Sequence, residues 1–361
     1  MKKQTYIRNL AVSCLTLMAL TTLTPVARAH PNTVEVHAGS VNTLAAAIAS
    51  AGPGGTVILQ TGLHSESGEV VVTFPVNIIS EDGAILETAT SPTVGPVALA
   101  ITAALHFKGA PGSTVRGVWF RPPAGTTGNC GVILEDSPGA KVLHNRMTAL
   151  QYGVFVQRAD YAVIHGNTLS ISTDGLLGLL PDTEGIISNA GEHVQVTDNQ
   201  VSGALFGIFA SGRSGTLAGN TLTGNFYGIF TCHNYDIDPF YYTFSGSPQF
   251  GPQPATAWEV HNNTVHGNGW GIIVTDGSHQ NLIWDNKASR NGDPLIWGTL
   301  GYDVELTGDT TRWGFPASAG YDNHVVQNGE GQKIVVKDCG NGSTVEGNGV
   351  SLVDTAKDPC Y

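Results

Sequence analysis

The sequence predicts an all-β fold, a single-stranded parallel β-helix, on two observations. The first is a repeated asparagine that is followed two residues later by an apolar residue, at Asn145, Asn167, Asn199, Asn220, Asn263, Asn286, Asn323 and Asn348. The second is a repeated glycine followed by apolar-x-apolar, at Gly153, Gly185, Gly207, Gly228 and Gly271, with Asp303 in the glycine position of the next repeat. In the undisturbed repeats the distance from the asparagine to the next glycine is 8 residues. The distance from that glycine to the next asparagine is 13 to 15 residues, so the period is 21 to 23 residues. Periods of this size are typical of solenoids, and the short alternating apolar runs indicate strands.

Three sets of apolar positions repeat with this period and predict the core. The first set lies three residues before the asparagine: Val142, Ile164, Val196, Leu217, Val260, Ile283 and Val345. The second lies two residues after it: Met147, Leu169, Val201, Leu222 and Val265. The third follows the glycine: Val154, Ile186, Ile208, Ile229, Ile272 and Val304. Stacked about 4.8 Å apart, these residues form continuous apolar ladders. We expect the asparagines to take left-handed turn geometry and to bond to their counterparts in the next coil.

The N-terminal segments predict a leader and a cap. Residues 1–29 have a basic start, an apolar middle and small residues at the end, the pattern of a signal peptide cleaved after Ala29. Residues 30–361 would then form one β-helix domain, secreted or periplasmic, and no other segment is long and apolar enough for membrane insertion. The stretch "SVNTLAAAIASAGPGGTVILQTGLH" reads as a polar cap, a short helix, a Pro-Gly turn and a strand. Such a helix covers the open end of a solenoid.

The same opening carries a resemblance. The layout "LAAAIASAGPGGTVILQTG" followed by "VVVTFPVNIISEDGAIL" resembles the start of the pectate-lyase-like, right-handed parallel β-helix superfamily, and "HNN…GIIV" resembles its carbohydrate-binding and sugar-hydrolase repeats. The resemblance implies a right-handed coil and a substrate groove on the strand that begins at the repeated glycine. The superfamily contains hydrolases, lyases, epimerases and non-enzymes. The polygalacturonase and pectate-lyase signatures are absent from the sequence, so neither activity is carried over.

Charge and cysteine content restrict the partners. The net charge is −12, and loss of the four basic residues of the leader makes it −16, which disfavours nucleic acid. Four cysteines remain, namely Cys130, Cys232, Cys339 and Cys360. An even number in an oxidising compartment permits two disulfides with three possible pairings, and we favour the pair Cys339–Cys360.

Four insertions interrupt the period, at residues 168–184, 232–257, 287–302 and 307–320. All four flank the strand that begins at the repeated glycine, and insertions in solenoids gather on one binding face. We therefore interpret this strand as the floor of a groove and the insertions as its walls.

The outward positions of that floor are apolar and aromatic. Two residues after the glycine lie Phe155, Ile187, Phe209, Phe230, Ile273 and then Glu305, and just before it lie Tyr152, Glu184, Phe206, Tyr227, Trp270 and Tyr302. An exposed ladder of this kind marks a binding surface, and aromatic faces suit sugar rings. The substrate-binding residues we predict are Tyr152, Phe155, Phe209, Tyr227, Phe230, Trp270, Tyr302, Arg312 and Trp313. The alternative is a ladder covered by residues 232–257 or buried in a homo-oligomer.

Acidic residues beside this ladder predict the chemistry. Asp303 and Glu305 lie two apart on one strand, which puts about 7 Å between their side-chain origins. That separation suits an inverting glycosidase, and we expect Asp276 and His233 nearby on the preceding coils. Asp303 replaces a repeated glycine, so a turn-capping role stays open.

Two metal hypotheses remain. His233, Asp236 and Asp238 in "HNYDID" offer ligands for Ca²⁺ or a transition metal. Cleavage after Ala29 would expose His30, whose amine and imidazole form a natural copper chelate, with His37 near in sequence. The sequence thus predicts a protein that hydrolyses a polysaccharide. The alternatives are a lyase of the same fold, a non-catalytic glycan-binding or assembly protein, and a copper-handling protein.

Overall fold

The computed structural model describes residues 32–80, 83–91, 101–171, 183–231, 255–274, 278–292, 303–306, 322–326, 328, 334–338, 343–346 and 350–354. The fold given below is that of these residues. They belong to one compact unit, Pro31–Tyr361. No helix in these ranges is long and apolar enough to cross a membrane.

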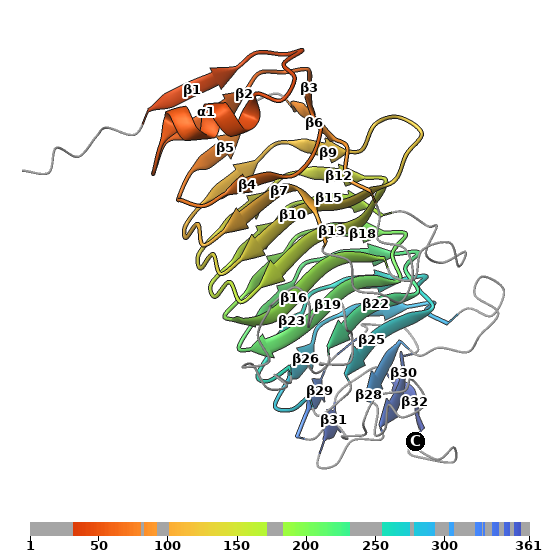
Figure 1. The fold of residues 1–361 in the computed structure, drawn as a ribbon. Helices are drawn as coiled ribbons and strands as arrows, with labels where there is room; N and C mark the ends of the chain where they lie inside the picture. The colour runs from red at the N-terminus through yellow and green to blue at the C-terminus, as the bar shows by residue number, and fades with distance from the viewer. Residues whose placement is uncertain are drawn as a thin grey trace, which may run out of the picture. The chain divides into compact units, whose positions relative to one another are not determined.

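Three parallel sheets run through this unit, and most coils contribute one strand to each (Figure 1). Sheet A contains β1 (Thr33–Val36), β2 (Thr56–Leu59), β5 (Asn77–Ile79), β8 (Thr114–Arg116), β11 (Lys141–Leu143), β14 (Val163–His165), β17 (Gln195–Thr197), β20 (Thr216–Ala218), β23 (Glu259–His261), β26 (Leu282–Trp284), β29 (His324–Val326) and β31 (Thr344–Glu346). Sheet B contains β3 (Leu63–Glu66), β6 (Ile85–Thr88), β9 (Trp119–Arg121), β12 (Arg146–Thr148), β15 (Thr168–Ser170), β18 (Gln200–Ser202), β21 (Thr221–Thr223), β24 (Thr264–His266) and β27 (Lys287–Ser289). Sheet C contains β4 (Val70–Val72), β7 (Ala103–Lys108), β10 (Gly128–Glu135), β13 (Leu150–Gln157), β16 (Glu184–Glu192), β19 (Phe206–Arg213), β22 (Tyr227–Thr231), β25 (Trp270–Val274), β28 (Val304–Leu306), β30 (Ile334–Asp338) and β32 (Val350–Asp354). The prediction of an all-β, right-handed parallel β-helix is confirmed.

The core consists of the predicted apolar ladders. In sheet A, Val142 pairs with Ile164 and Ile164 with Val196. Sheet B pairs Met147 with Leu169, and sheet C pairs Val154 with Ile186. All of these side chains lie in one buried cluster. Because equivalent residues stack directly above one another, each coil buries the apolar edge of its neighbour.

The predicted N-terminal helix is α1, Leu44–Ala51. Its apolar side is buried at the start of the core, and the Glu66 carboxylate of β3 accepts hydrogen bonds from the backbone N–H groups of Thr43 and Leu44, at 3.0 and 2.9 Å. A negative group at this end satisfies unpaired N–H groups and the helix dipole. The helix therefore caps the solenoid, as predicted.

A buried asparagine ladder runs along the corner between sheets A and B. The side-chain amide and backbone N–H of Asn167 both donate to Oδ1 of Asn199, at 2.9 Å each, and the amide also donates to the carbonyl of Val142. The coil-to-coil bonding is as expected, but the left-handed geometry belongs to the residue before each asparagine. These residues are His144, Gly166, Asp198, Gly219, Asn262 and Asp285. The asparagine side chain points inward and forms the ladder, while the preceding residue adopts the left-handed turn conformation.

One repeat assignment was wrong. We aligned Asn323 with Asn286, but the amide of Asn286 donates to Oδ1 of Asn328, at 2.8 Å. Asn323 instead accepts from Asn281 at 3.0 Å, in a separate ladder at the start of the sheet A strands. The error arose because the two ladders lie five residues apart and both use asparagine before an apolar residue.

The four cysteines do not form two disulfides. Cys130 is a free, buried thiol. It lies among apolar side chains on β10, and burial, followed by the negative charge of Glu69, raises the pKa of its thiol. The favoured pair Cys339–Cys360 lies outside the described residues.

All four insertions adjoin strands of sheet C. They lie between β15 and β16, β22 and β23, β27 and β28, and β28 and β29, so each precedes or follows a sheet C strand. A fifth interval, between β6 and β7, also leads into sheet C. The period is therefore interrupted at one sheet, which makes its outer face the place to look for function.

Candidate functional site: the outer face of sheet C

Sheet C has apolar residues on both faces. Its inward residues lie in the main core, and alternate residues form two further apolar clusters on the other side. The predicted outer row is confirmed in register: Phe155 pairs with Ile187, then follow Phe209, Phe230, Ile273 and Glu305. The second predicted row runs in register from Tyr152 through Glu184, Phe206 and Tyr227 to Trp270.

The aromatic rings of these two rows contact one another across the strands. Phe206 stacks on Tyr227 with 5.0 Å between ring centroids, and Phe209 stacks on Phe230 at 5.9 Å. Tyr227 also contacts Trp270, at 5.3 Å. Offset and edge-to-face contacts at these distances stabilise aromatic clusters beyond their buried area.

The expected exposure of this ladder was wrong for most of its members. Phe155 is 0% exposed, Phe230 5% and Trp270 9%, within a single chain. A residue that alternates away from the core of a solenoid is not necessarily at the surface, because other segments of the chain can cover it. Four apolar residues of the outer face are only partly buried: Leu205, Phe206, Phe209 and Phe226. We call these four residues the aromatic patch.

Asp303 has a clear structural role. Its Oδ1 accepts hydrogen bonds from the backbone N–H and the side-chain amide of Asn291, at 3.2 and 2.8 Å. Asn291 follows Asn225 and Asn268 in a second asparagine ladder, at the corner between sheets B and C. Asp303 therefore takes the next ladder position, the capping role that the sequence left open.

Glu305 lies at the end of the outer row and is 2% exposed, while Asp303 just before β28 is 7% exposed. Glu184 is buried in the second row, between Tyr152 and Phe206. The other predicted site residues lie outside the described residues: His233, Asp236, Asp238, Asp276, Tyr302, Arg312 and Trp313. The structure places Glu305 in the outer row with Phe230 and Ile273, and it places Asp303 in the asparagine ladder at the corner between sheets B and C. It does not test the rest.

A charged network at the N-terminal end of the same face was not predicted. His106 on β7 contacts Glu69 Oε1 through Nδ1 at 3.2 Å and Glu135 Oε2 through Nε2 at 3.1 Å. Lys108 and Arg158 also contact Glu135, at 3.2 and 3.4 Å. Arg158 makes a two-pronged contact with Asp136, at 2.8 Å from both Nε and Nη2.

The pKa shifts follow from these contacts. Burial alone would lower the pKa of His106, but hydrogen bonds to Glu135 and Glu69 outweigh it and raise the pKa. The bond from His106 lowers the pKa of Glu135 against the opposing effect of burial. For Glu69, burial acts to raise the pKa, yet hydrogen bonds from His106 and the Ala103 N–H lower it overall. The contacts of His106 with two carboxylates therefore favour its protonated form, the imidazolium.

The sequence contains a signal that could have located this network. "GVIL" at Gly131 has the glycine-apolar-x-apolar pattern, and Gly131 is in register with Gly153 because Val132 pairs with Val154. Extending the repeat by one coil to Gly131 places Ile133 in the outer row. His106 on β7 pairs with Ile133, and Glu135 lies two residues further along β10.

Two family models match the chain. The model described as "Periplasmic copper-binding protein (NosD)" matches residues 65–247, about half of the chain, and the model described as "Right handed beta helix region" matches residues 185–357. The chain belongs to the NosD family. No curated protein matches it in sequence.

Three solved structures are similar to this chain, and the first two, with TM-scores above 0.5, show the fold. DFA-IIIase from Arthrobacter chlorophenolicus A6 in complex with GF2 has a TM-score of 0.56 at 14% identity, covering 89% of this chain and 87% of that one. The same enzyme without its lid has a TM-score of 0.55 at 15% identity, covering 92% and 93%. The Dettilon tailspike protein (gp208) has a TM-score of 0.49 at 14% identity, covering 88% and 67%.

The family description raises the question of copper, and the described residues do not fit it. Within these ranges no group of three or more His, Cys, Asp or Glu side chains is arranged to hold a metal ion. The Cys130 thiol is buried with a raised pKa, which disfavours the thiolate that binds metals. The rings of His144 and His165 lie 5.0 Å apart, but Nδ1 of His165 already contacts Thr197 Oγ1 and Asp198.

Proposed function

We propose that this protein is an extracytoplasmic enzyme that binds a polysaccharide along the outer face of sheet C and hydrolyses it. The observation that carries the proposal is the aromatic patch, whose member Phe209 lies in the same row of side chains as Glu305. Sugar rings have apolar C–H faces, and apolar patches that reach the surface of soluble proteins mark binding sites. From Phe209 the row passes Phe230 and Ile273 to Glu305, three coils or about 14 Å along the solenoid. A glycan parallel to the solenoid axis would span this distance.

Asp303 and Glu305 are the proposed catalytic pair, with Asp276 and His233 on the neighbouring coils. Asp303 and Glu305 lie two residues apart in the sequence, and carboxyl separations of about 6.5–9.5 Å suit an inverting mechanism. Asp303 Oδ1 accepts two N–H groups of Asn291, an arrangement that stabilises an ionised carboxylate and fixes its orientation. We therefore assign Asp303 as the base that activates water and Glu305 as the acid that protonates the leaving oxygen.

The structure makes Asp303→Asn a clean test. Asparagine occupies the three preceding positions of this ladder, so the variant keeps the two hydrogen bonds and loses only the ionisable group. Wild type, Asp303→Asn and Glu305→Gln are assayed for new reducing ends on a panel of polysaccharides, with Ca²⁺ and with a chelator. Loss of an acid or base slows such reactions by about 10²–10⁴-fold. Glu259→Gln, an exposed acid on sheet A, is the control that should not change the rate.

Three outcomes would contradict the proposed hydrolase activity. Equal rates in parent and variants would show that Asp303 and Glu305 do no chemistry. Products that absorb in the ultraviolet would identify a lyase, and the panel would then be repeated with variants of the His106 network. Binding without cleavage would identify a non-catalytic glycan-binding protein.

Copper binding is a second candidate, favoured by the description of the family model. The proposed ligands are the amine and imidazole of His30 after cleavage behind Ala29, with His37 near in sequence. His37 is exposed, and its Nδ1 contacts Gln60 Oε1 at 2.9 Å. Calorimetric titration with Cu²⁺ should show one tight site in a chain that starts at His30 and none in a chain that starts at Asn32. Equal binding by the two chains contradicts this assignment.

A further inference from the structure

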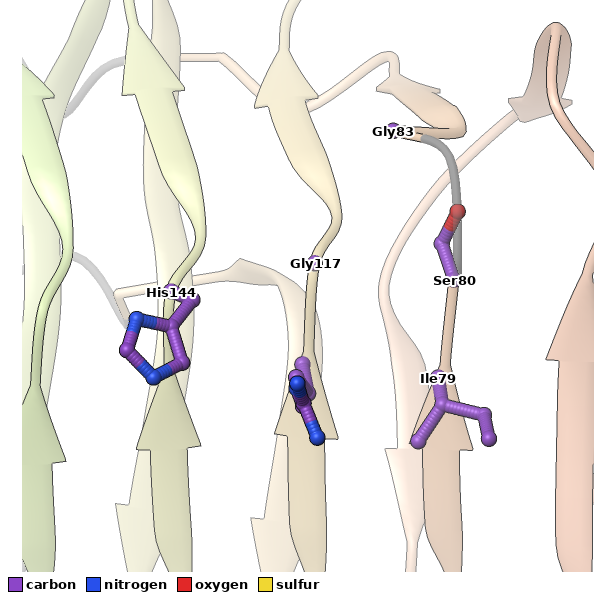
Figure 2. A pocket seen from close by; sticks show the side chains of 6 residues that line it. Ile79, Ser80, Gly83, Gly117 and His144 are labelled. Atoms are coloured by element: carbon purple, nitrogen blue, oxygen red, sulfur yellow. The ribbon is translucent and has the colours of Figure 1, made fainter.

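A pocket of about 580 Å³ lies at the corner between sheets A and B, away from sheet C. Its lining residues are Ile79, Ser80, Gly83, Arg116, Gly117 and His144. They come from three neighbouring coils, because the N–H of Ser80 donates to the carbonyl of Arg116 and the N–H of Gly117 donates to that of Leu143. Figure 2 shows Ser80, Gly117 and His144 in this order across the coils. The volume is within the range of small-molecule sites.

Gly117 lines the pocket without a side chain. Gly117 has a φ of 75°, and a Cβ on it would lie 2.3 Å from the carbonyl oxygen of Ser80. Only glycine fits between the coils there, which leaves the space above the turn open. The neighbouring coil has His144 at the same left-handed position, with a φ of 51°, so that the next turn along carries an imidazole.

The His144 ring is held in place. A Cβ on Gly166 would lie 2.4 Å from its Nδ1, so the ring occupies the space that this glycine leaves. The His165 ring meets it edge-on, with 5.0 Å between centroids, and Thr197 Oγ1 in turn contacts His165 Nδ1 at 2.9 Å. A side chain fixed before binding loses little entropy when a ligand arrives.

The described lining residues include two basic side chains, Arg116 and His144, although the chain has a net charge of −12. Arg116 is exposed, and no ion pair or side-chain hydrogen bond engages its guanidinium in the part of the chain that the structure describes. Lys141, also exposed, lies one coil further on the same face of sheet A. Ser80 is buried, and its Oγ accepts from the Ala84 N–H at 2.7 Å while its own proton can still donate. The six lining residues that the structure describes include no carboxylate.

We propose that this pocket binds a small polar ligand through an oxyanion group, a carboxylate, sulfate or phosphate. The guanidinium of Arg116 is the main contact, since its planar fork matches the geometry of such groups. His144 supports it from the next coil, and Ile79 contacts the apolar part of the ligand. The site is separate from the proposed glycan site, and neither proposal depends on the other.

Calorimetric titration of the mature protein with glucuronate, glucose 6-sulfate and glucose 6-phosphate tests this proposal, with glucose as the neutral control. At least one of the three anionic sugars should bind tenfold or more tightly than glucose, and comparison of the three identifies the preferred oxyanion. Arg116→Gln should weaken that binding at least tenfold. His144→Asn should weaken it less, because asparagine occupies the same left-handed position at Asn262 and preserves the turn.

Lys141→Gln is the matched control: it removes the same charge from the same face but does not line the pocket. It should change the affinity less than twofold, and thermal unfolding of each variant shows that the fold is retained. The proposal is overturned if glucose binds as well as the anionic sugars, or if Lys141→Gln weakens binding as much as Arg116→Gln. It is also overturned if a cation such as Ca²⁺ binds and His144→Asn abolishes that binding, since Glu81 and Asp82 lie between Ser80 and Gly83 in sequence.

Discussion

The outer face of sheet C has two regions, one charged and one aromatic, on strands that pair in one continuous register. Its first coils carry the network of His106, Glu69 and Glu135, in which every charge has an opposite partner at 3.4 Å or less. Its later coils carry aromatic rows that are mostly buried but open at Phe206 and Phe209. The backbone is the same in both regions, so the side chains alone decide the role. A region whose groups satisfy one another stabilises the fold, whereas a region with an open apolar patch can bind a partner.

The buried part of the aromatic rows should give the largest effect on stability. Phe155 is 0% exposed between Ile133 and Ile187, so Phe155→Ala should lower the free energy of unfolding by about 3–4 kcal/mol through lost burial and a cavity. Denaturant titration measures this loss. A loss below about 1 kcal/mol would show that the outer face is not a second core.

The charged network should give the next largest effect. His106→Gln leaves Glu69 and Glu135 without their shared positive partner, although Lys108 and Arg158 still contact Glu135. We expect a loss of about 2–3 kcal/mol, toward the lower end of the cost of breaking a buried pair. His193→Gln, which removes a histidine that only stacks on Tyr161, is the matched control and should cost far less.

The same network predicts a pH dependence. The pKa of His106 is raised. The contribution of His106 to the free energy of unfolding is therefore complete below the ordinary histidine pKa of 6.5 and is lost as the pH rises through the folded-state pKa. The pKa values of Glu69 and Glu135 are lowered. Their contribution to the free energy of unfolding is therefore complete above their ordinary value of 4.5 and is lost as the pH falls through the folded-state pKa. The difference in melting temperature between wild type and His106→Gln should therefore be largest between these two values. A difference that does not change with pH would exclude an imidazolium at His106.

The sequence allowed the coil and its core to be predicted because their signals are local and repeated. Val142, Asn145 and Met147 recur with one period, and each repeat confirms the others. The charged network could not be found in this way, since Glu69, His106 and Glu135 come from coils 37 and 29 residues apart and share no repeated pattern. The burial of Phe155 was missed for a different reason. Alternation along a strand separates its two faces but does not show which other segments cover the outer one.

The aromatic patch should separate binding from stability. Phe206 is partly buried, so Phe206→Ala should cost about 1–2 kcal/mol, less than Phe155→Ala. The affinity of the Phe206→Ala variant for the preferred glycan should nevertheless fall about tenfold or more, because the sugar can no longer stack against the partly exposed Phe206 ring. Titration calorimetry with oligosaccharides measures both variants. If Phe155→Ala weakens binding as much as Phe206→Ala, the patch has no special role.

Asp303→Asn should give the smallest change in stability, less than about 0.5 kcal/mol, because asparagine completes the ladder that begins at Asn225. Asp303→Ala is the contrasting variant, since it leaves the Asn291 amide and N–H without an acceptor, which costs about 1–3 kcal/mol. Thermal and denaturant unfolding compare the two. Equal losses would contradict the capping role.

The central claim is that a glycan lies on the outer face of sheet C. The most direct test is a crystal structure of the Asp303→Asn variant with an oligosaccharide that the panel has identified as a substrate. Our account predicts sugar rings against Phe206, Phe209 and Phe226, with a glycosidic bond near Glu305. Sugar density on sheets A or B, with the aromatic patch unchanged, would contradict it.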